Sequence, residues 1–244
     1  GLVIATFASS LIAGVAIAAA LAVSFGVTFA HLGRLAAQTP LLPARLRVDR
    51  NFQTVLLSRA SINLGFYTFV GFLFFFVRDV VGAGNARQTT GILFLAFTLA
   101  GVIGAAFAGR TSDRIDKRVV VSVAGVGIAI ALGALAGANS LWAILLFGAL
   151  AGIAWGAFFT ADWAIAYVVL PADSMAAAMG VWNLAAALPQ IAAPLLGAAI
   201  VSAAGIRAVQ IAVIVEFALG TFWLWRLPVD LTGSTSSGIE SVQT

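Results

Sequence analysis

The sequence predicts an all-α fold, a polytopic membrane bundle of seven transmembrane helices. Of its 244 residues, 62% are hydrophobic and 9% are charged, whereas a soluble domain carries about 25% charged residues. The apolar residues gather in seven long runs, and the short stretches between these runs hold most of the charge. Too little polar surface is left to coat a soluble globule, so the expected solvent is a lipid bilayer.

Each run is long enough to cross the bilayer as a helix, which takes about 20 residues for about 30 Å of hydrocarbon. Helices are required because a backbone in lipid has to satisfy its own hydrogen bonds. The runs cover residues 2–30, 54–77, 91–108, 119–138, 141–170, 175–204 and 208–227. The third run is the shortest, and we expect its helix to continue into the polar residues on both sides.

Lys and Arg are concentrated in every second connection, which predicts how the chain crosses the membrane. One side carries Arg34, Arg45, Arg47 and Arg50 after the first run, Arg110, Arg114, Lys117 and Arg118 after the third, and Arg226 near the end of the seventh. The other side carries Arg78, Arg87 and Arg207. Because cytoplasmic loops hold the excess of Lys and Arg, we expect a multi-pass protein of the inner (plasma) membrane whose loop 109–118 and carboxyl terminus are cytoplasmic.

The connections divide the chain into unequal parts. Residues 34–53 form a long linker in which Pro40 and Pro43 oppose helix continuation. Residues 228–244 are rich in Ser, Thr and Gly, which predicts a disordered cytoplasmic tail. The expected parts are therefore one helix in residues 1–33, the linker 34–53, a six-helix unit 54–227 and the tail 228–244. The chain begins at Gly1 within an apolar run and without an initiator Met, so we expect a truncated piece of a longer membrane protein.

Composition argues against several other classes of function. Because the chain has no cysteine and a single histidine, His31, we expect no disulfide, no metal site and no cofactor. The basic residues fall in short loops rather than on one polar face, which argues against nucleic acid as a partner. No HExxH motif, paired intramembrane aspartates or Ser/His arrangement indicates an enzyme. A retinal pigment needs a lysine inside a helix, and the only lysine, Lys117, lies in a loop.

The most informative stretch is the charged turn, residues 109–118, between the third and fourth runs. It reads Gly-Arg-Thr-Ser-Asp-Arg-Ile-Asp-Lys-Arg, and six of its ten residues are charged. It resembles the cytoplasmic signature of the major facilitator superfamily, roughly G-x-L-[AS]-D-R-x-G-[RK]-[RK]. The matching residues are Gly109, Ser112, Asp113, Arg114, Lys117 and Arg118, whereas Thr111 replaces the usual Leu and Asp116 the usual Gly.

The two departures fit the weaker second copy of the motif, which this family carries in its carboxyl-terminal half. A long cytoplasmic linker before six spans, with the motif between the second and third of them, matches the same half. The resemblance covers essentially the whole chain. It implies the second half of a twelve-helix transporter, with residues 1–33 as the last helix of the amino-terminal half.

The resemblance also implies a gating motif, made by Gly109, Asp113, Arg114, Lys117 and Arg118. At a helix end, Asp113 can accept bonds from the free N–H groups that begin a neighbouring helix. The cations can pair with acids or with membrane lipid phosphates. The alternative is a solvated, positively charged inner loop without a gating role.

A second resemblance concerns the cargo. The series Asp162-Trp163-Ala164, Leu170-Pro171-Ala172-Asp173, Gly180-Val181-Trp182-Asn183, Leu188-Pro189-Gln190 and Pro194 looks like the branch of glycoside–cation and sucrose–proton symporter-like proteins. Arg59 and Asn63 in the second run look similar to that branch as well. The resemblance implies proton-coupled transport of a sugar or glycoside.

Arg59 and Asp162 are charges expected within the membrane. At 1.5 Å per residue, Arg59 lies about 10 Å and Asp162 about 13 Å from the cytoplasmic ends of their helices, so a salt bridge between them is geometrically possible. Lone charges at this depth are costly and normally face the bundle interior and pair. The pair either breaks and forms as access alternates, or is static, with Arg59 snorkelling toward the interface. Asn63 and Tyr67 follow Arg59 at four-residue steps and share its face.

The fifth run carries small and polar residues at helical spacing. Gly148, Trp155 and Asp162 are seven apart, so they drift by only about 20° per step. Gly148, Gly152 and Gly156 repeat every four residues, which predicts a close-packing ridge on the same side of the helix as Asp162. Trp155 can stack on a sugar ring or fill the bundle.

The last two runs contribute further candidates for the substrate and proton pathway. Asn183 and Gln190 are seven apart, and their amides can bind substrate hydroxyls or join helices. Pro189 and Pro194 free backbone carbonyls and can kink this helix. Glu216, near the middle of the last run, can carry a coupling proton or serve as a neutral structural acid.

These observations predict a fragment of a secondary active transporter that works by alternating access. Its expected partners are a small-molecule substrate, protons, lipids and the missing amino-terminal half. Proton-coupled transport of a sugar or glycoside is the first expectation. Proton-linked efflux of drug-like lipophilic compounds is the alternative among transporters, because an apolar cavity suits such cargo, and a receptor or sensor is the alternative of another class.

Overall fold

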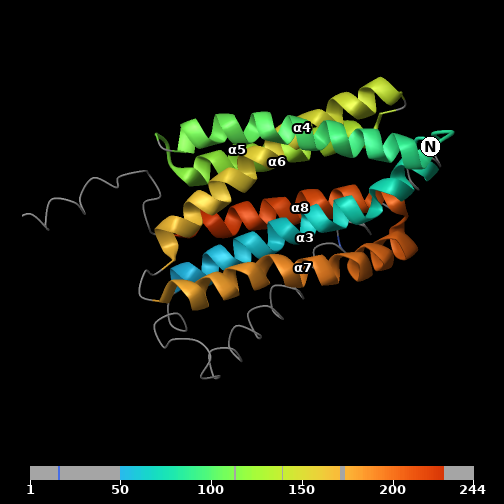
Figure 1. Cartoon of the computed structure of the whole chain (residues 1–244). Coiled ribbons are helices and arrows are strands. Elements are labelled where there is room, and N and C mark those ends of the chain that lie inside the picture. Colours follow the sequence, from blue (N-terminus) through green and yellow to red (C-terminus); the bar gives the residue numbers. More distant parts are fainter. Residues whose placement is uncertain (1–15, 17–49, 113, 139, 171–173, 228–244) are drawn as a thin grey trace, which may run out of the picture.

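The computed structural model describes Ala16 and residues 50–227, apart from 113, 139 and 171–173. This part forms the helices α3 (Arg50–Asp79), α4 (Ala86–Ser112), α5 (Lys117–Ala136), α6 (Leu141–Val169), α7 (Met175–Ala204) and α8 (Ile206–Trp225). All 6 are long and apolar enough to cross a membrane, and they lie side by side in one bundle (Figure 1). The all-helical membrane bundle is confirmed for this part, while the first predicted span, 2–30, and the tail, 228–244, lie outside the described residues.

Helix boundaries follow the apolar runs to within a few residues. The run 175–204 coincides with α7, and α4 extends beyond the run 91–108 at both ends, as expected. Helix α3 begins at Arg50, inside the predicted linker. Polar side chains at a helix end can reach the interface while the helix continues. A hydropathy run therefore marks the part of a helix in lipid rather than its whole length.

Local sequence explains several helix ends. The Asp116 side chain caps α5 by accepting the backbone N–H of Arg118 at 2.8 Å. The Ser140 hydroxyl caps α6 by accepting the N–H of Ala143 at 3.2 Å. Between α7 and α8 the chain turns at Gly205, whose φ of 83° is a conformation that favours glycine.

The helices form two groups of three. Helix α6 packs extensively against α4 and α5, whereas α3 packs extensively against α7 and α8. The groups touch mainly where α5 meets α8, with smaller contacts from α3 to α4 and α6. Figure 1 shows the groups on opposite sides of the bundle. We call the boundary between them the central seam. Helices α3 and α6 hold equivalent places in the two groups, as in a bundle built from two three-helix repeats.

Helices α4 and α6 approach each other backbone to backbone. A Cβ atom added at Gly156 would lie 1.9 Å from the carbonyl oxygen of Gly101. One added at Gly152 would lie 2.1 Å from the carbonyl oxygen of Phe97. The third member of the row, Gly148, faces the side chain of Leu93. The predicted close-packing ridge on α6 is therefore confirmed, and its partner is α4.

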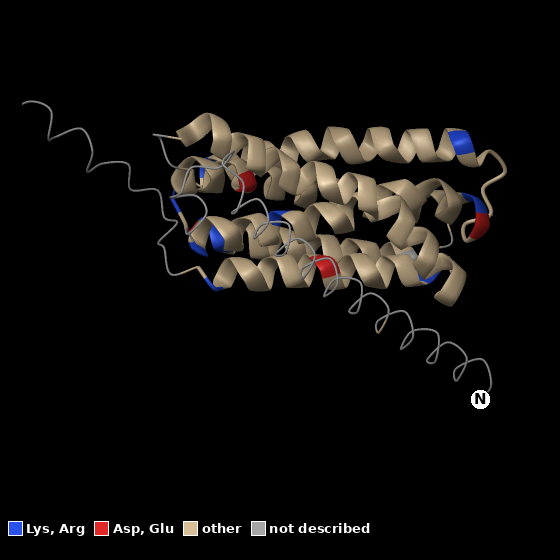
Figure 2. Cartoon of the chain, turned by 90° about the horizontal axis from the view of Figure 1, so that it is seen from below, with Lys and Arg blue, Asp and Glu red and all other residues tan. Residues whose placement is uncertain are grey.

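Charge lies mostly at the two ends of the bundle (Figure 2). The end with the charged turn carries Arg50, Arg110, Arg114, Asp116, Lys117, Arg118 and Arg226, and the opposite end carries Arg78, Asp79, Arg87 and Arg207. Among the described residues, the charged side chains away from both ends are Arg59, Asp162 and Glu216. The end with the charged turn carries the excess of cations, and for this reason we expect it to face the cytoplasm. This orientation stays a prediction.

Candidate functional site

The charged turn connects α4 to α5. Gly109 is half-buried in the last turns of α4, and Arg114 is exposed in the connection. Lys117, the first residue of α5, has only 5% of its surface exposed. Asp113 lies outside the described residues, so its predicted role at a neighbouring helix start stays a prediction. Asp116, which departs from the family pattern, has a local purpose as the cap of α5.

Arg118 ties α5 to the end of α8 across the central seam. Its guanidinium pairs with Asp116 at 3.0 Å and donates to the backbone carbonyl of Leu227 at 2.8 Å. It also lies 5.8 Å from the ring centre of Trp225, whose Nε1–H donates to Ser122 at 2.7 Å. This part of the motif therefore works within the protein as a tie between two helices.

Arg59 and Asp162 form an ion pair in the interior. Helix α3 supplies the arginine and α6 the aspartate, so the pair crosses the central seam. Their side chains are 5% and 7% exposed. The similar depths of the two residues in their helices made a salt bridge possible, and the structure contains that salt bridge. The pair is buried among helices and does not reach the ends of the bundle, which excludes snorkelling of Arg59 in this conformation.

Two tryptophans surround the Arg59 guanidinium. Its central carbon lies 4.4 Å from the ring centre of Trp182 and 5.7 Å from that of Trp163. Its Nε–H also donates to the backbone carbonyl of Trp182 at 3.2 Å. Sequence reasoning did not assign these tryptophans a role. Trp163 directly follows Asp162, which is a weak signal, whereas the place of Trp182 depends on how α7 is rotated.

Asn63 and Tyr67 do not join the ion pair. The Asn63 amide is buried and donates to the carbonyl of Arg59 at 2.8 Å, within its own helix. Tyr67 is half-buried and makes an edge contact with the ring of Phe66, 5.3 Å between centres. The expectation that they line one cavity with Arg59 stays a prediction.

Trp155 is committed to packing in this conformation. Its ring stacks on Phe66 with centres 3.7 Å apart and planes 7° from parallel. Phe158 and Phe217 pack around it at 5.2 and 6.3 Å. The stack joins α6 to α3, so Trp155 and Asp162 both face α3 while the glycine ridge faces α4. The expectation that the ridge lies on the same side of α6 as Asp162 was wrong, because each step of four residues turns the ridge by about 40° around the helix. A sugar would have to displace Phe66 in order to use this ring.

The candidates on α7 lie on an exposed face. Asn183, Gln190 and Pro194 are exposed, whereas Pro189 is buried. The predicted common direction of the two amides is consistent with this pattern of exposure. They are therefore separate from the buried pair, which meets α7 at Trp182 on its other side.

Glu216 is the second buried acid. It lies on α8 with 2% of its surface exposed, and one carboxyl oxygen has no hydrogen-bond partner among the described residues. The same oxygen would lie 3.2 Å from a Cβ added at Gly65, so the carboxyl group rests against α3. Glu216 thus faces α3 from the α8 side, whereas Arg59 leaves α3 toward α6 and α7. The structure brings together Arg59 and Asp162 but leaves Glu216 apart.

Comparison with known proteins places these features in a family. The family model described as Major Facilitator Superfamily matches residues 1–240. Over 77 residues the chain is also 32% identical to the class E tetracycline resistance protein of Escherichia coli. That match covers 32% of this chain and 19% of the relative. With a family match over nearly its whole length and 6 membrane-competent helices, the chain is a multi-pass membrane protein that belongs to the Major Facilitator Superfamily, a family of transporters rather than enzymes.

Proposed function

We propose that the full-length protein is a secondary active transporter in which this unit moves against a second, amino-terminal half. The observation that carries the proposal is the buried Arg59–Asp162 pair at the central seam. Charged groups within membrane helices are costly and are typical of substrate and ion pathways. Since breaking such a pair strands a buried charge, the pair favours one arrangement of α3 and α6 strongly over others.

Coupling to protons follows from the same chemistry. Protonation of Asp162 removes the negative partner of Arg59, so a proton can shift the balance between two arrangements of the seam. Glu216 supplies a second acid that lacks a cationic partner among the described residues. A charged carboxylate without a partner is expensive in such a site, so Glu216 is expected to be neutral here and to release its proton where water reaches it.

The substrate path is expected between the two halves, near the middle of the membrane. We propose an amphipathic, drug-like compound as cargo, exported in exchange for protons. Two features support this cargo: many large apolar side chains are exposed between the charged ends of the unit, and the chain is similar over part of its length to a tetracycline resistance protein.

Uptake of a sugar or glycoside is the second candidate. The exposed amides of Asn183 and Gln190, on one side of α7, support it because they can hydrogen-bond hydroxyl groups. The closed stack of Trp155 on Phe66 argues against a sugar ring at that position in this conformation.

Transport by the full-length protein in proteoliposomes tests the proposal. We expect tetracycline to move against its gradient when a proton gradient is imposed, and sucrose or a glucoside not to move. Arg59→Gln and Asp162→Asn should each abolish the tetracycline transport that the proton gradient drives. The matched controls Arg78→Gln and Asp79→Asn, which alter an exposed pair at the end of α3, should leave it unchanged. Movement of the sugar alone would select the second candidate, and movement of no compound in the panel under any gradient would contradict transport of both classes.

A further inference from the structure

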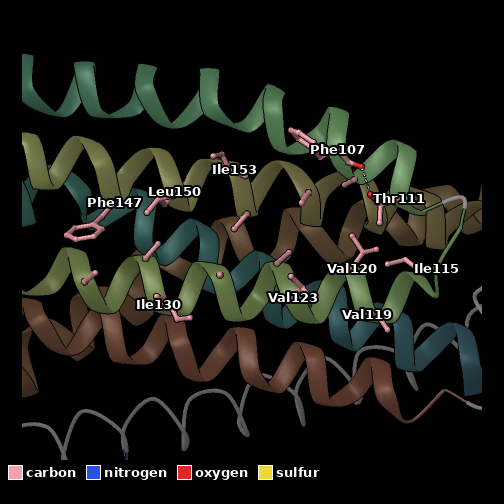
Figure 3. Close-up of a pocket in the computed structure, with 17 residues that line it drawn as sticks. Phe107, Thr111, Ile115, Val119, Val120, Val123, Ile130, Phe147, Leu150 and Ile153 are labelled. Atoms are coloured by element: carbon pink, nitrogen blue, oxygen red, sulfur yellow. Dashed lines mark hydrogen bonds between the residues drawn. The ribbon is translucent and has the colours of Figure 1, made fainter.

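A long apolar groove runs along the outer side of α5, away from the Arg59–Asp162 pair. It has a volume of about 510 Å³, within the range of roughly 300–1,000 Å³ found for small-molecule sites. Helix α6 supplies one wall, α5 another, and the last turns of α4 close one end (Figure 3). Every lining residue except Thr111 is apolar or glycine.

The groove is open toward the surroundings of the bundle. Its rim includes Phe107, Val123 and Ile130, which are 69%, 67% and 67% exposed. From Val119 to Ala134 it follows α5 for about 22 Å at 1.5 Å per residue. One leaflet of a bilayer contributes about 15 Å of hydrocarbon. The groove is therefore long enough to hold the full depth of an acyl chain.

Two arginines stand at the end that α4 closes. Thr111 and Ile115 line this end, and the residues before them, Arg110 and Arg114, are both exposed. Arg110 donates to the carbonyl of Ala106 in its own helix at 3.2 Å, which leaves its other N–H groups for an anion. The nearby cations Lys117 and Arg118 interact with other groups of the protein. Arg110 and Arg114 are therefore the two cations at this end whose exposed side chains can bind an external anion.

We propose that this groove binds an anionic phospholipid. The headgroup phosphate lies at Arg110 and Arg114, and one acyl chain follows α5 past Val123 toward Ala134. Charge complementarity at one end and apolar walls along the rest match an amphiphile with an anionic head. Basic sites between membrane helices are known to select such headgroups. A membrane helix from another protein would fill the walls but would bring no anion to the arginines.

Native mass spectrometry of the full-length protein, with phosphatidylglycerol or phosphatidylcholine added, tests the headgroup. The wild type should retain phosphatidylglycerol in preference to phosphatidylcholine. Each arginine near an anionic headgroup contributes roughly fivefold, so Arg110→Gln with Arg114→Gln should reduce this preference by up to about 25-fold. Arg87→Gln with Arg207→Gln, at the opposite end, is the matched control and should not. Equal retention of both lipids, or an equal loss in the control, would overturn the assignment.

A second arm tests the chain. Ala157→Phe fills the groove and should lower retention of both lipids, while soluble glycerol 3-phosphate should not compete. If Ala157→Phe fails to elute as a folded protein, Val123→Trp on the exposed rim replaces it. Competition by glycerol 3-phosphate as strong as by the lipid would reduce the site to an anion site on the turn. A protein mass retained in place of the lipid would make the groove a helix-docking surface, and either result overturns the proposal.

Discussion

Substitution of Gly156 by alanine tests whether the backbone contact between α4 and α6 holds this unit together. The new Cβ would lie 1.9 Å from the carbonyl oxygen of Gly101 and 2.7 Å from its carbonyl carbon. Ordinary contact begins near 3.4 Å, so the two backbones have to separate by about 1.5 Å at this point. A flexible side chain cannot absorb the change, because the opposing atoms belong to the backbone.

The expected cost follows from two opposing effects. Overpacking of this kind destabilises a protein by about 1–3 kcal/mol, and more where the backbone has to move. Alanine in place of glycine stabilises a helix by up to about 1 kcal/mol, which offsets part of this loss. In lipid the solvent is as apolar as the helix surfaces, so close packing is a main source of helix association. We therefore expect Gly156→Ala to lower the melting temperature of the full-length protein in detergent by several degrees, at about 2–4 °C per kcal/mol.

Gly133→Ala is the matched control for this experiment. Gly133 lies in α5, and a Cβ added there would meet no atom within 4 Å. Its substitution should leave the melting temperature unchanged or raise it slightly. Gly152→Ala, which faces the carbonyl of Phe97, should behave like Gly156→Ala. Equal melting temperatures for Gly156→Ala and Gly133→Ala would refute the idea that α4 and α6 depend on this contact.

Three further substitutions probe the charged residues. Asp162→Asn should lower the free energy of unfolding by about 3–5 kcal/mol because it strands the Arg59 charge, and adding Arg59→Met should recover part of the loss in a double-mutant cycle. Arg118→Ala removes a charged hydrogen bond to the end of α8, worth about 1.5–3 kcal/mol, and should speed amide hydrogen exchange in the last turn of that helix. Glu216→Gln should change the unfolding free energy by less than about 1 kcal/mol, as expected for a neutral site, while it alters the pH dependence of transport.

For each of these three substitutions, a different result would contradict the expected role of the residue. The exposed pair Arg78–Asp79 is the reference for the ion-pair cycle, since exposed pairs are worth at most about 1 kcal/mol. An equally small coupling at the buried pair would mean that water reaches it. Unchanged exchange at the end of α8 in Arg118→Ala would make the tie to Leu227 incidental. A loss of several kcal/mol in Glu216→Gln would indicate a charged carboxylate with a partner that holds it.

The sequence allowed prediction of the helices and of one interior contact, for clear physical reasons. A backbone in lipid is helical, so long apolar runs predict the spans nearly to their ends. Arg59 and Asp162 could be paired because charges at matching depths on neighbouring spans have few other ways to avoid hydrocarbon. The Asp116 cap was not predicted, although an aspartate shortly before an apolar run is a helix-start signal.

The other contacts depend on how each helix is rotated about its own axis, and the sequence of a membrane protein does not reveal this rotation. Lipid and the bundle interior are both apolar, so no amphipathic stripe shows which side of a helix faces its neighbours. For this reason the stack of Trp155 on Phe66 and the contact of Glu216 with Gly65 could not be foreseen. The apolar groove along α5 was hidden in the same way, since its walls resemble any lipid-facing surface in sequence.

Two connections join the groups of helices on either side of the central seam. The connections from α4 to α5, from α5 to α6 and from α7 to α8 stay within one group, whereas those that leave α3 and α6 pass from one group to the other. Relative sliding of the groups would strain these two crossing connections first. A pair of spectroscopic labels on α4 and α6 should therefore keep a constant spacing through a working cycle, while labels on α3 and α6 should report it. Because residues 1–244 contain no cysteine, both label pairs can be introduced into this unit without removing any of its own residues.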